Sequence, residues 1–230
     1  MFNCPLSPEK ADRLVEHLAL NPDSYAIDVG CGEGEFLIRV AERYKIVGIG
    51  LDKNSDLIEV ANNKVKTRIP SQDVSFVCQD AKSFAWENQK ADLIICIGSE
   101  FIFGGYRQAL QCLSNSLIDS GKLLIGTVFW KKEPNSEYLS LMNKENPHFD
   151  YLTTVEIGIE QGFIPLYLCR SNDDEWDDFE SQHAQKQYLT ALHNGSKQAF
   201  ERIQRWQRGY LKWGHETMGF VFLLFQKRHI

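Results

Sequence analysis

The sequence predicts an α/β fold, a doubly wound and mostly parallel sheet with helices on both faces. Along residues 24–130, short runs that are apolar at every position alternate with segments whose apolar residues recur at helical spacing. Strands that are apolar throughout are covered on both faces, and their alternation with helices implies right-handed crossovers between parallel strands. A loop with three glycines directly follows the first strand, in a region where such sheets bind ligands.

The first element is a helix near the amino terminus. Ser7 and Pro8 supply a hydroxyl cap and a proline at the first helical position. Leu14 and Leu18 then fall on one face, and Pro22 lies just beyond the point where the helix is expected to end.

Five strands and three intervening helices are expected next. The strands are predicted at residues 25–29, 46–51, 74–77, 91–97 and 122–129. Apolar residues at helical spacing predict one helix after the first strand, one after the second and one over residues 106–118. The residues that carry these patterns are Phe36, Leu37, Val40 and Ala41, then Leu57, Ile58, Ala61 and Val65, then Leu110, Leu113 and Leu117.

The alternation becomes less regular after residue 130. Residues 131–150 predict a long loop with room for one helical turn, because asparagines and prolines recur in it. A helix over residues 151–161, a strand over 163–169, helical structure over 172–214 and a final strand over 218–225 are expected to complete the chain.

Composition and charge limit the class of protein. The 230 residues carry a formal net charge of −6, which disfavours a dedicated nucleic-acid binder because such proteins show a basic excess. No apolar stretch approaches the roughly 20 residues of a membrane span, and the amino terminus lacks the features of a signal peptide. The six cysteines form no CxxC pair and no cluster with histidine, so we expect core thiols and no metal site. These features predict a cytoplasmic protein without a membrane partner.

The loop after the first strand carries the first part of a candidate ligand site. Gly30, Gly32 and Gly34 let the chain turn sharply and let a ligand approach the backbone. The helix that begins near Glu33 presents free backbone N–H groups at its start. The glycine spacing alone is a weak signal, since loops of this kind serve several nucleotides.

Acids at the ends of three successive strands strengthen this signal. Asp52 ends the second strand, where a carboxylate can accept hydrogen bonds from both hydroxyls of a ribose. Asp80, followed by Ala81, ends the third strand, where a carboxylate can accept a hydrogen bond from the exocyclic amine of an adenine. Asp28 ends the first strand, and core packing does not explain three such acids. The sequence therefore predicts a nucleoside-type site.

Glu33 and Glu35 narrow the choice of nucleoside. A dinucleotide site prefers the spacing G-x-G-x-x-G, whereas this loop has G-x-G-x-G. Carboxylates beside a pyrophosphate would repel it, and they suit a ligand that carries an ammonium and a sulfonium. A nicotinamide oxidoreductase is thus a disfavoured rival.

The segment from Asp28 to Gly34 resembles motif I of the class I S-adenosylmethionine-dependent methyltransferases. Asp52 matches the acid that binds the ribose in that family, and residues 79–81 are similar to its adenine-contacting motif. Residues 92–99 and 121–124 resemble its fourth-strand and fifth-strand motifs. The resemblance covers about residues 24–130 and implies S-adenosylmethionine as the cofactor. The cofactor-binding residues that it implies are Asp28, Gly30, Cys31, Gly32, Gly34, Asp52, Lys53, Asp80, Ala81, Ile97, Gly98 and Ser99.

The resemblance also implies the rest of the fold. The family has a seven-stranded, Rossmann-like sheet whose last strand is antiparallel, and the strands at 163–169 and 218–225 would complete such a sheet. We therefore expect a single domain over residues 1–230. Many members join the last two strands by a short loop, whereas residues 172–214 intervene here. We expect this insertion to form a helical cap over the acceptor site.

The fourth-strand motif bears on the methyl acceptor. Residues 97–100 read Ile-Gly-Ser-Glu and lack both the Asn/Asp-Pro-Pro-Tyr/Phe segment of adenine-N6 enzymes and the Pro-Cys nucleophile of cytosine-C5 enzymes. A small-molecule acceptor is therefore expected, and the atom that receives the methyl group stays open. A hydroxyl or ammonium acceptor would need a base to remove a proton. The candidates are Glu100, which is nearest to the expected cofactor, and His148, Glu175, Asp177 and His183.

Two alternative functions stay open. In residues 197–213, basic residues alternate with aromatic ones. Such a helix could clamp RNA, as in an RNA methyltransferase, or it could pack its aromatic side chains inward and leave its cations in water. The chain could also bind the cofactor without transferring its methyl group. The sequence does not indicate an oligomeric state.

Overall fold

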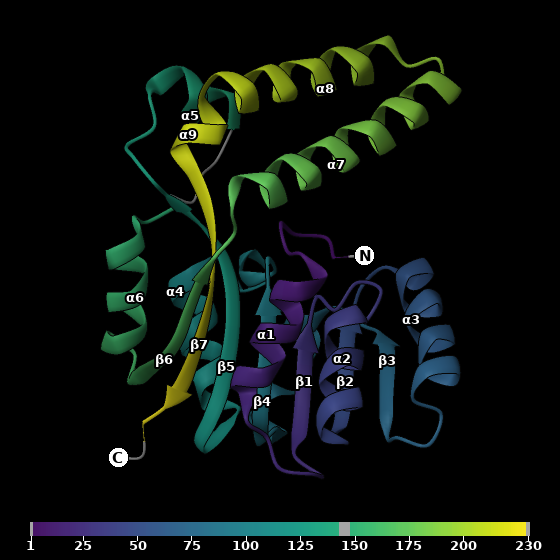
Figure 1. The fold of residues 1–230 in the computed structure, drawn as a ribbon, viewed down its shortest axis with the longest axis vertical. Coiled ribbons are helices and arrows are strands. Elements are labelled where there is room, and N and C mark those ends of the chain that lie inside the picture. The colour runs from purple at the N-terminus through teal and green to yellow at the C-terminus, as the bar shows by residue number, and fades with distance from the viewer. Residues whose placement is uncertain (1, 143–147, 229–230) are drawn as a thin grey trace.

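The computed structural model of the protein describes residues 2–142 and 148–228. The described strands form a seven-stranded sheet in the order β3-β2-β1-β4-β5-β7-β6 (Figure 1). β7 is antiparallel to both of its neighbours, and the other strands are parallel to one another, so the predicted fold class is confirmed. The strands are β1 (Tyr25–Val29), β2 (Val47–Asp52), β3 (Val74–Cys78), β4 (Ala91–Ile97), β5 (Leu117–Trp130), β6 (Phe163–Arg170) and β7 (Met218–Lys227).

Helices cover both faces of this sheet. On one face, α1 and α2 bury Leu14, Leu18 and Leu37 against the strands. On the other face, α4 and α6 bury Leu110 and Ile157. The helices are α1 (Pro8–Leu18), α2 (Glu35–Tyr44), α3 (Ser55–Arg68), α4 (Tyr106–Asn115), α5 (Ser136–Met142), α6 (Tyr151–Glu160), α7 (Asp173–His193), α8 (Lys197–Gly209) and α9 (His215–Thr217).

Two predicted boundaries near residue 117 differ from the structure. The helix expected over residues 106–118 ends at Asn115, and β5 begins at Leu117 instead of residue 122. Leu117 is fully buried and pairs with Ala91 of β4, so its apolar side chain serves the sheet rather than the helix. The sequence could not separate these roles, because one apolar residue fits both periodicities.

Residues 131–150 contain more helix than the sequence predicted. α5 has seven residues, where a loop with one turn was expected. Tyr138 of α5 is almost fully buried, and its ring lies 5.9 Å from that of Trp213 and 6.4 Å from that of Trp130. These aromatic contacts stabilise a helix too short to form alone. Residues 143–147, which include a predicted part of the loop, lie outside the described residues.

The insertion between β6 and β7 is helical, as predicted. α7 and α8 form a long antiparallel hairpin that stands above the carboxyl ends of the parallel strands (Figure 1). Asn172 and Glu175 form a capping box at the start of α7, and the side chain of Ser196 caps α8. A short π-helical turn at Tyr210–Gly214 links α8 to α9 and β7. No helix in the described ranges is long and apolar enough to cross a membrane.

Candidate functional site

The glycine-rich loop lies between the ends of β1, β2 and β4. Gly30 has a φ of +67°, and its backbone N–H donates to the carbonyl of Leu51 at 2.8 Å. A Cβ atom at Gly30 would lie 2.1 Å from the Oγ atom of Ser99, so only glycine fits beside that side chain. Gly32 also has a positive φ, of +54°, and has open space on its Cβ side. The loop is therefore packed at Gly30 and open to a ligand at Gly32.

The carboxylate of Asp52 holds this loop in place. Its Oδ2 atom accepts a hydrogen bond from the backbone N–H of Gly32 at 3.0 Å, and its Oδ1 atom accepts one from Asn54 at 2.9 Å. Asp52 remains partly exposed and lines the cavity described below. The side chain thus joins the ends of β1 and β2 and can still accept hydrogen bonds from a ligand.

Asp28 is a buried acid at the end of β1. It is 4% exposed. Burial and the nearby negative charge of Asp52 raise the pKa of Asp28 to about 8. A buried carboxyl without a cationic partner favours its neutral form, and an approaching cation would favour ionisation. Asp28 is therefore suited to sense a positively charged group in the site.

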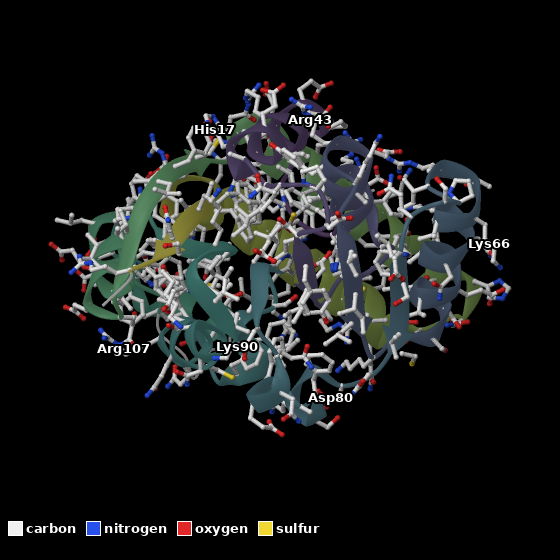
Figure 2. The ribbon with its side chains drawn as sticks, turned by 90° about the horizontal axis from the view of Figure 1, so that it is seen from below. His17, Arg43, Lys66, Asp80, Lys90 and Arg107 are labelled. Carbon is white, nitrogen blue, oxygen red and sulfur yellow. The ribbon has the colours of Figure 1, made fainter. Side chains whose placement is uncertain are left out.

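Asp80 lies at the rim of the molecule (Figure 2). Its Oδ1 atom accepts a hydrogen bond from the backbone N–H of Lys82 at 2.9 Å and caps the short 3₁₀ helix Ala81–Ser83. Ala81 is buried, and its carbonyl accepts a hydrogen bond from the indole N–H of Trp86 at 2.7 Å. Asp80 therefore has a local structural role as well as a position beside the candidate site.

One large cavity brings the predicted cofactor residues together. Its volume is about 1720 Å³, whereas ordinary small-molecule sites occupy roughly 300–1,000 Å³. All the residues that the motifs predicted line this cavity, except Gly34. Gly34 instead packs below the loop, where a Cβ atom would lie 2.5 Å from the ring of Phe76. The cavity can hold a nucleoside and leave room for a second molecule.

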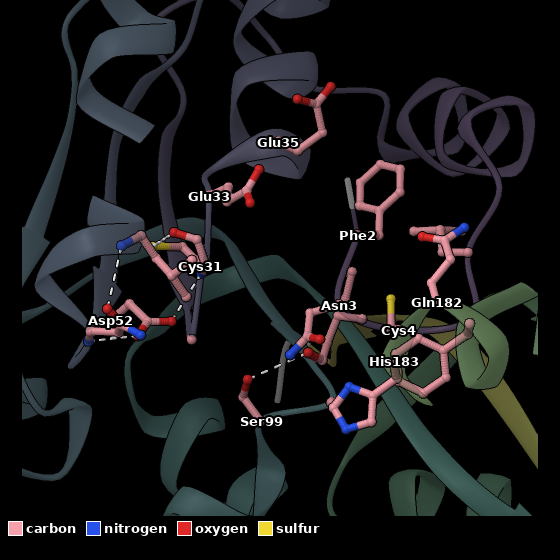
Figure 3. Close-up of a pocket in the computed structure, with 18 of the residues that line it drawn as sticks. Phe2, Asn3, Cys4, Cys31, Glu33, Glu35, Asp52, Ser99, Gln182 and His183 are labelled. Atoms are coloured by element: carbon pink, nitrogen blue, oxygen red, sulfur yellow. Dashed lines mark hydrogen bonds between the residues drawn. The ribbon is translucent and has the colours of Figure 1, made fainter. Parts of the chain in front are cut away.

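Glu33 and Glu35 line the cavity (Figure 3). Cations of α2 and α3 already balance their charge. Lys64 lies 3.0 Å from Glu33 and 3.4 Å from Glu35. Arg39 and Arg68 lie 2.9 Å from Glu35. Burial opposes the ionisation of Glu35, but these partners outweigh it and lower its pKa. These ion pairs weaken the inference that the two acids were free to attract a cationic ligand.

The structure separates the five candidate bases. Glu100 does not line the cavity, and its Oε1 atom accepts a hydrogen bond from Thr127 at 2.7 Å. Asp177 also lies outside the lining and accepts one from the hydroxyl of Tyr210 at 2.7 Å. His148 packs against Trp130, away from the cavity.

The two remaining candidates line the cavity. Glu175 is bound to Lys10 and accepts a hydrogen bond from the backbone N–H of Ser7 at 3.1 Å, which gives it a structural role. His183 projects from α7 toward the cavity and stacks on Phe179 (Figure 3). Of the five candidates, His183 is the one whose position suits direct contact with a bound molecule.

Sequence reasoning missed one wall of the cavity, which residues 2–4 and 6–9 form. Phe101 and Ile102, which follow the fourth-strand motif, line another part of it. The local sequence gave little indication that the amino-terminal segment lines the cavity. Hydrogen bonds with Ser171 and Glu175, which are distant in the chain, hold this segment in place. The sequence of α7 gave a clearer indication of a cavity wall, since the residues that line the cavity recur at helical spacing.

The aromatic residues of α8 pack inward, while its cations differ in their surroundings. The indole N–H of Trp206 donates to Glu180 at 2.8 Å, and Tyr210 is buried. Arg205 and Arg208 line a separate open hollow near α5, whereas Arg202 lines the main cavity. The basic residues thus do not form one continuous stripe. In the part of the chain that the structure describes, no three potential metal ligands gather.

Comparison with known proteins agrees with the motifs. A family model for the methyltransferase domain matches residues 26–121. The uncharacterized protein YjhP of Escherichia coli is 28% identical over 180 residues, which cover 77% of this chain and 72% of that protein. Cyclopropane mycolic acid synthase 2 of Mycobacterium leprae is 24% identical over 143 residues, 57% of this chain and 46% of the synthase.

Solved structures share the fold along the whole chain. A methyltransferase from Geobacter sulfurreducens, solved with S-adenosyl-L-homocysteine, superposes with a TM-score of 0.89 at 21% identity. The superposition covers 99% of this chain and 94% of the other. The crystal structure of YjhP gives a TM-score of 0.88. The resemblance to class I methyltransferases that the motifs indicated is confirmed by the domain match and the shared fold.

Proposed function

We propose that this chain, which resembles class I methyltransferases in its domain match and its fold, transfers a methyl group from S-adenosylmethionine to a small-molecule acceptor. One observation carries the proposal: the predicted cofactor residues, which come from the ends of β1, β2, β3 and β4, line one cavity that the α7–α8 hairpin also lines. A site of this volume can hold a cofactor and an acceptor together.

The residues of the cavity fit the parts of the proposed cofactor. Asp52 would accept hydrogen bonds from the ribose, and Asp80 with Ala81 would contact the adenine. The open space beside Gly32 leaves room for the ligand against the backbone. Asp28 would lie near the cationic part of the cofactor, where ionisation of its buried carboxyl becomes favourable. When bound, the cofactor supplies a methyl group made electrophilic by its sulfonium.

The protein's contribution would be alignment, exclusion of water and removal of a proton. The α7–α8 hairpin and the amino-terminal segment would form a cap that orients the acceptor for in-line attack. We assign His183 as the proton acceptor for a hydroxyl or ammonium nucleophile, because the other four candidate bases have structural partners or face elsewhere. Lining residues of α7 and α8 would then determine which acceptor fits.

Calorimetry with S-adenosylhomocysteine and with NAD tests the cofactor. We expect S-adenosylhomocysteine to bind and NAD to give no heat of binding. Binding of NAD without any response to S-adenosylhomocysteine would refute the proposal. Transfer is then tested with radiolabelled S-adenosylmethionine and a panel of small hydroxylated, amine and unsaturated compounds. Cofactor binding without label transfer to any compound would favour a cofactor-binding protein without transfer activity.

An RNA methyltransferase is the second candidate. Arg205, Arg208 and Lys212 line the open hollow beside α5, outside the main cavity, and could contact phosphates. The separation of Arg202 from these residues favours a small acceptor instead. Binding of a short RNA with an affinity that falls steeply with salt concentration, together with loss of that binding in Arg205→Ala, would support the RNA candidate.

A further inference from the structure

One face of α7 forms a continuous wall of the cavity. Every fourth residue along this face lines it, which is the spacing of one helix side. The chemistry changes along the wall: two carboxylates lie near the sheet, an amide follows, then a cation, and polar uncharged groups lie at the far end of the hairpin. The residues are Asp174, Asp178, Gln182, Lys186, Thr190 and, just beyond the end of α7, Asn194.

The cation on this wall lies opposite a second cation on α8. The contacts Asp177–Tyr210, Glu180–Trp206 and Tyr188–Phe200 determine the antiparallel register of the two helices. In that register, Lys186 of α7 lies opposite Arg202 of α8. Both side chains line the cavity, so two positive charges from different helices face the same space.

Within residues 2–142 and 148–228, the side chains of Lys186 and Arg202 make no ion pair or hydrogen bond. Arg39, which also lines the cavity, differs in this respect because it lies 2.9 Å from Glu35. On α8, Lys197 lies 3.9 Å from Glu201. Two like charges that face the same space repel each other, and an anion bound between them would offset that repulsion.

We propose that Lys186 and Arg202 bind an anionic group, a phosphate or a carboxylate, on the methyl acceptor. The inference rests on the proposed function and names the acceptor's chemical class. The planar guanidinium of Arg202 can bind either group with two parallel hydrogen bonds, and Lys186 adds a second charge-assisted bond.

The position of His183 sets the size of such an acceptor. His183 and Lys186 are three residues apart on one helix face, which is about 4.5 Å along the axis. The anionic group and the methylated atom of the acceptor would therefore be separated by only a few bonds. A compact metabolite with one anionic end fits this arrangement, whereas a polyanion would extend beyond two cations.

The test uses inorganic phosphate and acetate as probes of the full-length protein, titrated at constant ionic strength with and without S-adenosylhomocysteine. We expect the protein to bind at least one probe, and the stronger one identifies the preferred group. Lys186→Met and Arg202→Met should each weaken that binding by about tenfold, the size expected for one charged hydrogen bond. Lys197→Met and Arg205→Met make the same charge change outside the cavity. They should change the affinity for the probe by less than about twofold.

The outcomes separate this inference from the proposed function. Binding of S-adenosylhomocysteine with no probe binding, or equal weakening by all four substitutions, would overturn the anion site while leaving the methyltransferase assignment intact. Loss of probe binding only in the Lys186 and Arg202 variants supports the site even if S-adenosylhomocysteine fails to bind. Thermal melts identify any variant that fails to fold. Lys186→Gln or Arg202→Gln, which introduces a polar side chain of similar length, is then tested in place of that variant.

Discussion

Asp52 at the end of β2 accepts a hydrogen bond at 3.0 Å from the backbone N–H of Gly32 in the loop after β1. The same carboxylate therefore stabilises the conformation of the loop and is the proposed hydrogen-bond acceptor for the ribose. Two adjacent parallel strands thereby contribute to one site, although twenty residues separate the two partners in the chain.

We expect Asp52→Ala to weaken binding of S-adenosylhomocysteine by roughly 10- to 100-fold, since it removes a charged hydrogen-bond acceptor from the ligand and from Gly32. Calorimetry measures the change. Glu59→Ala, which removes an exposed acid from the nearby α3, is the matched control and should bind like the unaltered protein. Equal affinity of the two variants would show that Asp52 does not contact the ligand.

The ligand-free protein should lose stability as pH rises from about 4 to about 8. The pKa of Asp28 is about 8 in the folded protein and about 3.9 in an unfolded chain. This raised pKa adds stability that is fully present below pH 4 and is lost progressively as the pH rises to the folded pKa, by about 5–6 kcal/mol in all. Asp28→Asn should flatten this part of the profile in urea unfolding. An unchanged slope in the variant would contradict the prediction.

The buried pair Lys10–Glu175 should stabilise the junction between α1 and α7. Their side chains are 6% and 7% exposed, and Glu175 also accepts a hydrogen bond from Asn172 at 2.8 Å. Glu175→Gln leaves Lys10 buried without its counter-charge, so we expect the free energy of unfolding to fall by about 3–5 kcal/mol. Arg107→Met breaks an exposed pair with Glu160 and should change it by less than about 1 kcal/mol. Similar urea midpoints for both variants would count against the prediction.

His183→Ala should lower turnover by roughly 10²- to 10⁴-fold, the range of a general base, with an acceptor identified in the labelled screen. Its affinity for S-adenosylhomocysteine should stay the same. Added imidazole should restore part of the activity of this variant, and it should not restore activity to Asp52→Ala. Full activity of His183→Ala would show that the acceptor needs no base at this position.

Much of the fold followed from local patterns. The apolar strands and the helical stripes alternate at their correct periods, so strands β1 to β4 and helices α2 and α3 were located within a few residues. The predicted boundary between helix and strand near Leu117 was wrong. A single apolar residue is compatible with the pattern of a helix and with that of a strand, and only its pairing partner distinguishes the two. The helix at residues 136–142 was underestimated because aromatic side chains from distant segments stabilise it.

The sequence by itself determined the methyltransferase fold class and the cofactor motifs, since glycines and acids at strand ends depend on short-range geometry that recurs along the chain. The tertiary structure alone decided three further points. It paired Glu33 and Glu35 with cations of α3, it left His183 and the ion-paired Glu175 as the candidate bases that line the cavity, and it placed Lys186 opposite Arg202. Each of these depends on contacts between segments far apart in sequence, and helical spacing within one segment cannot reveal which distant partner its side chains will meet.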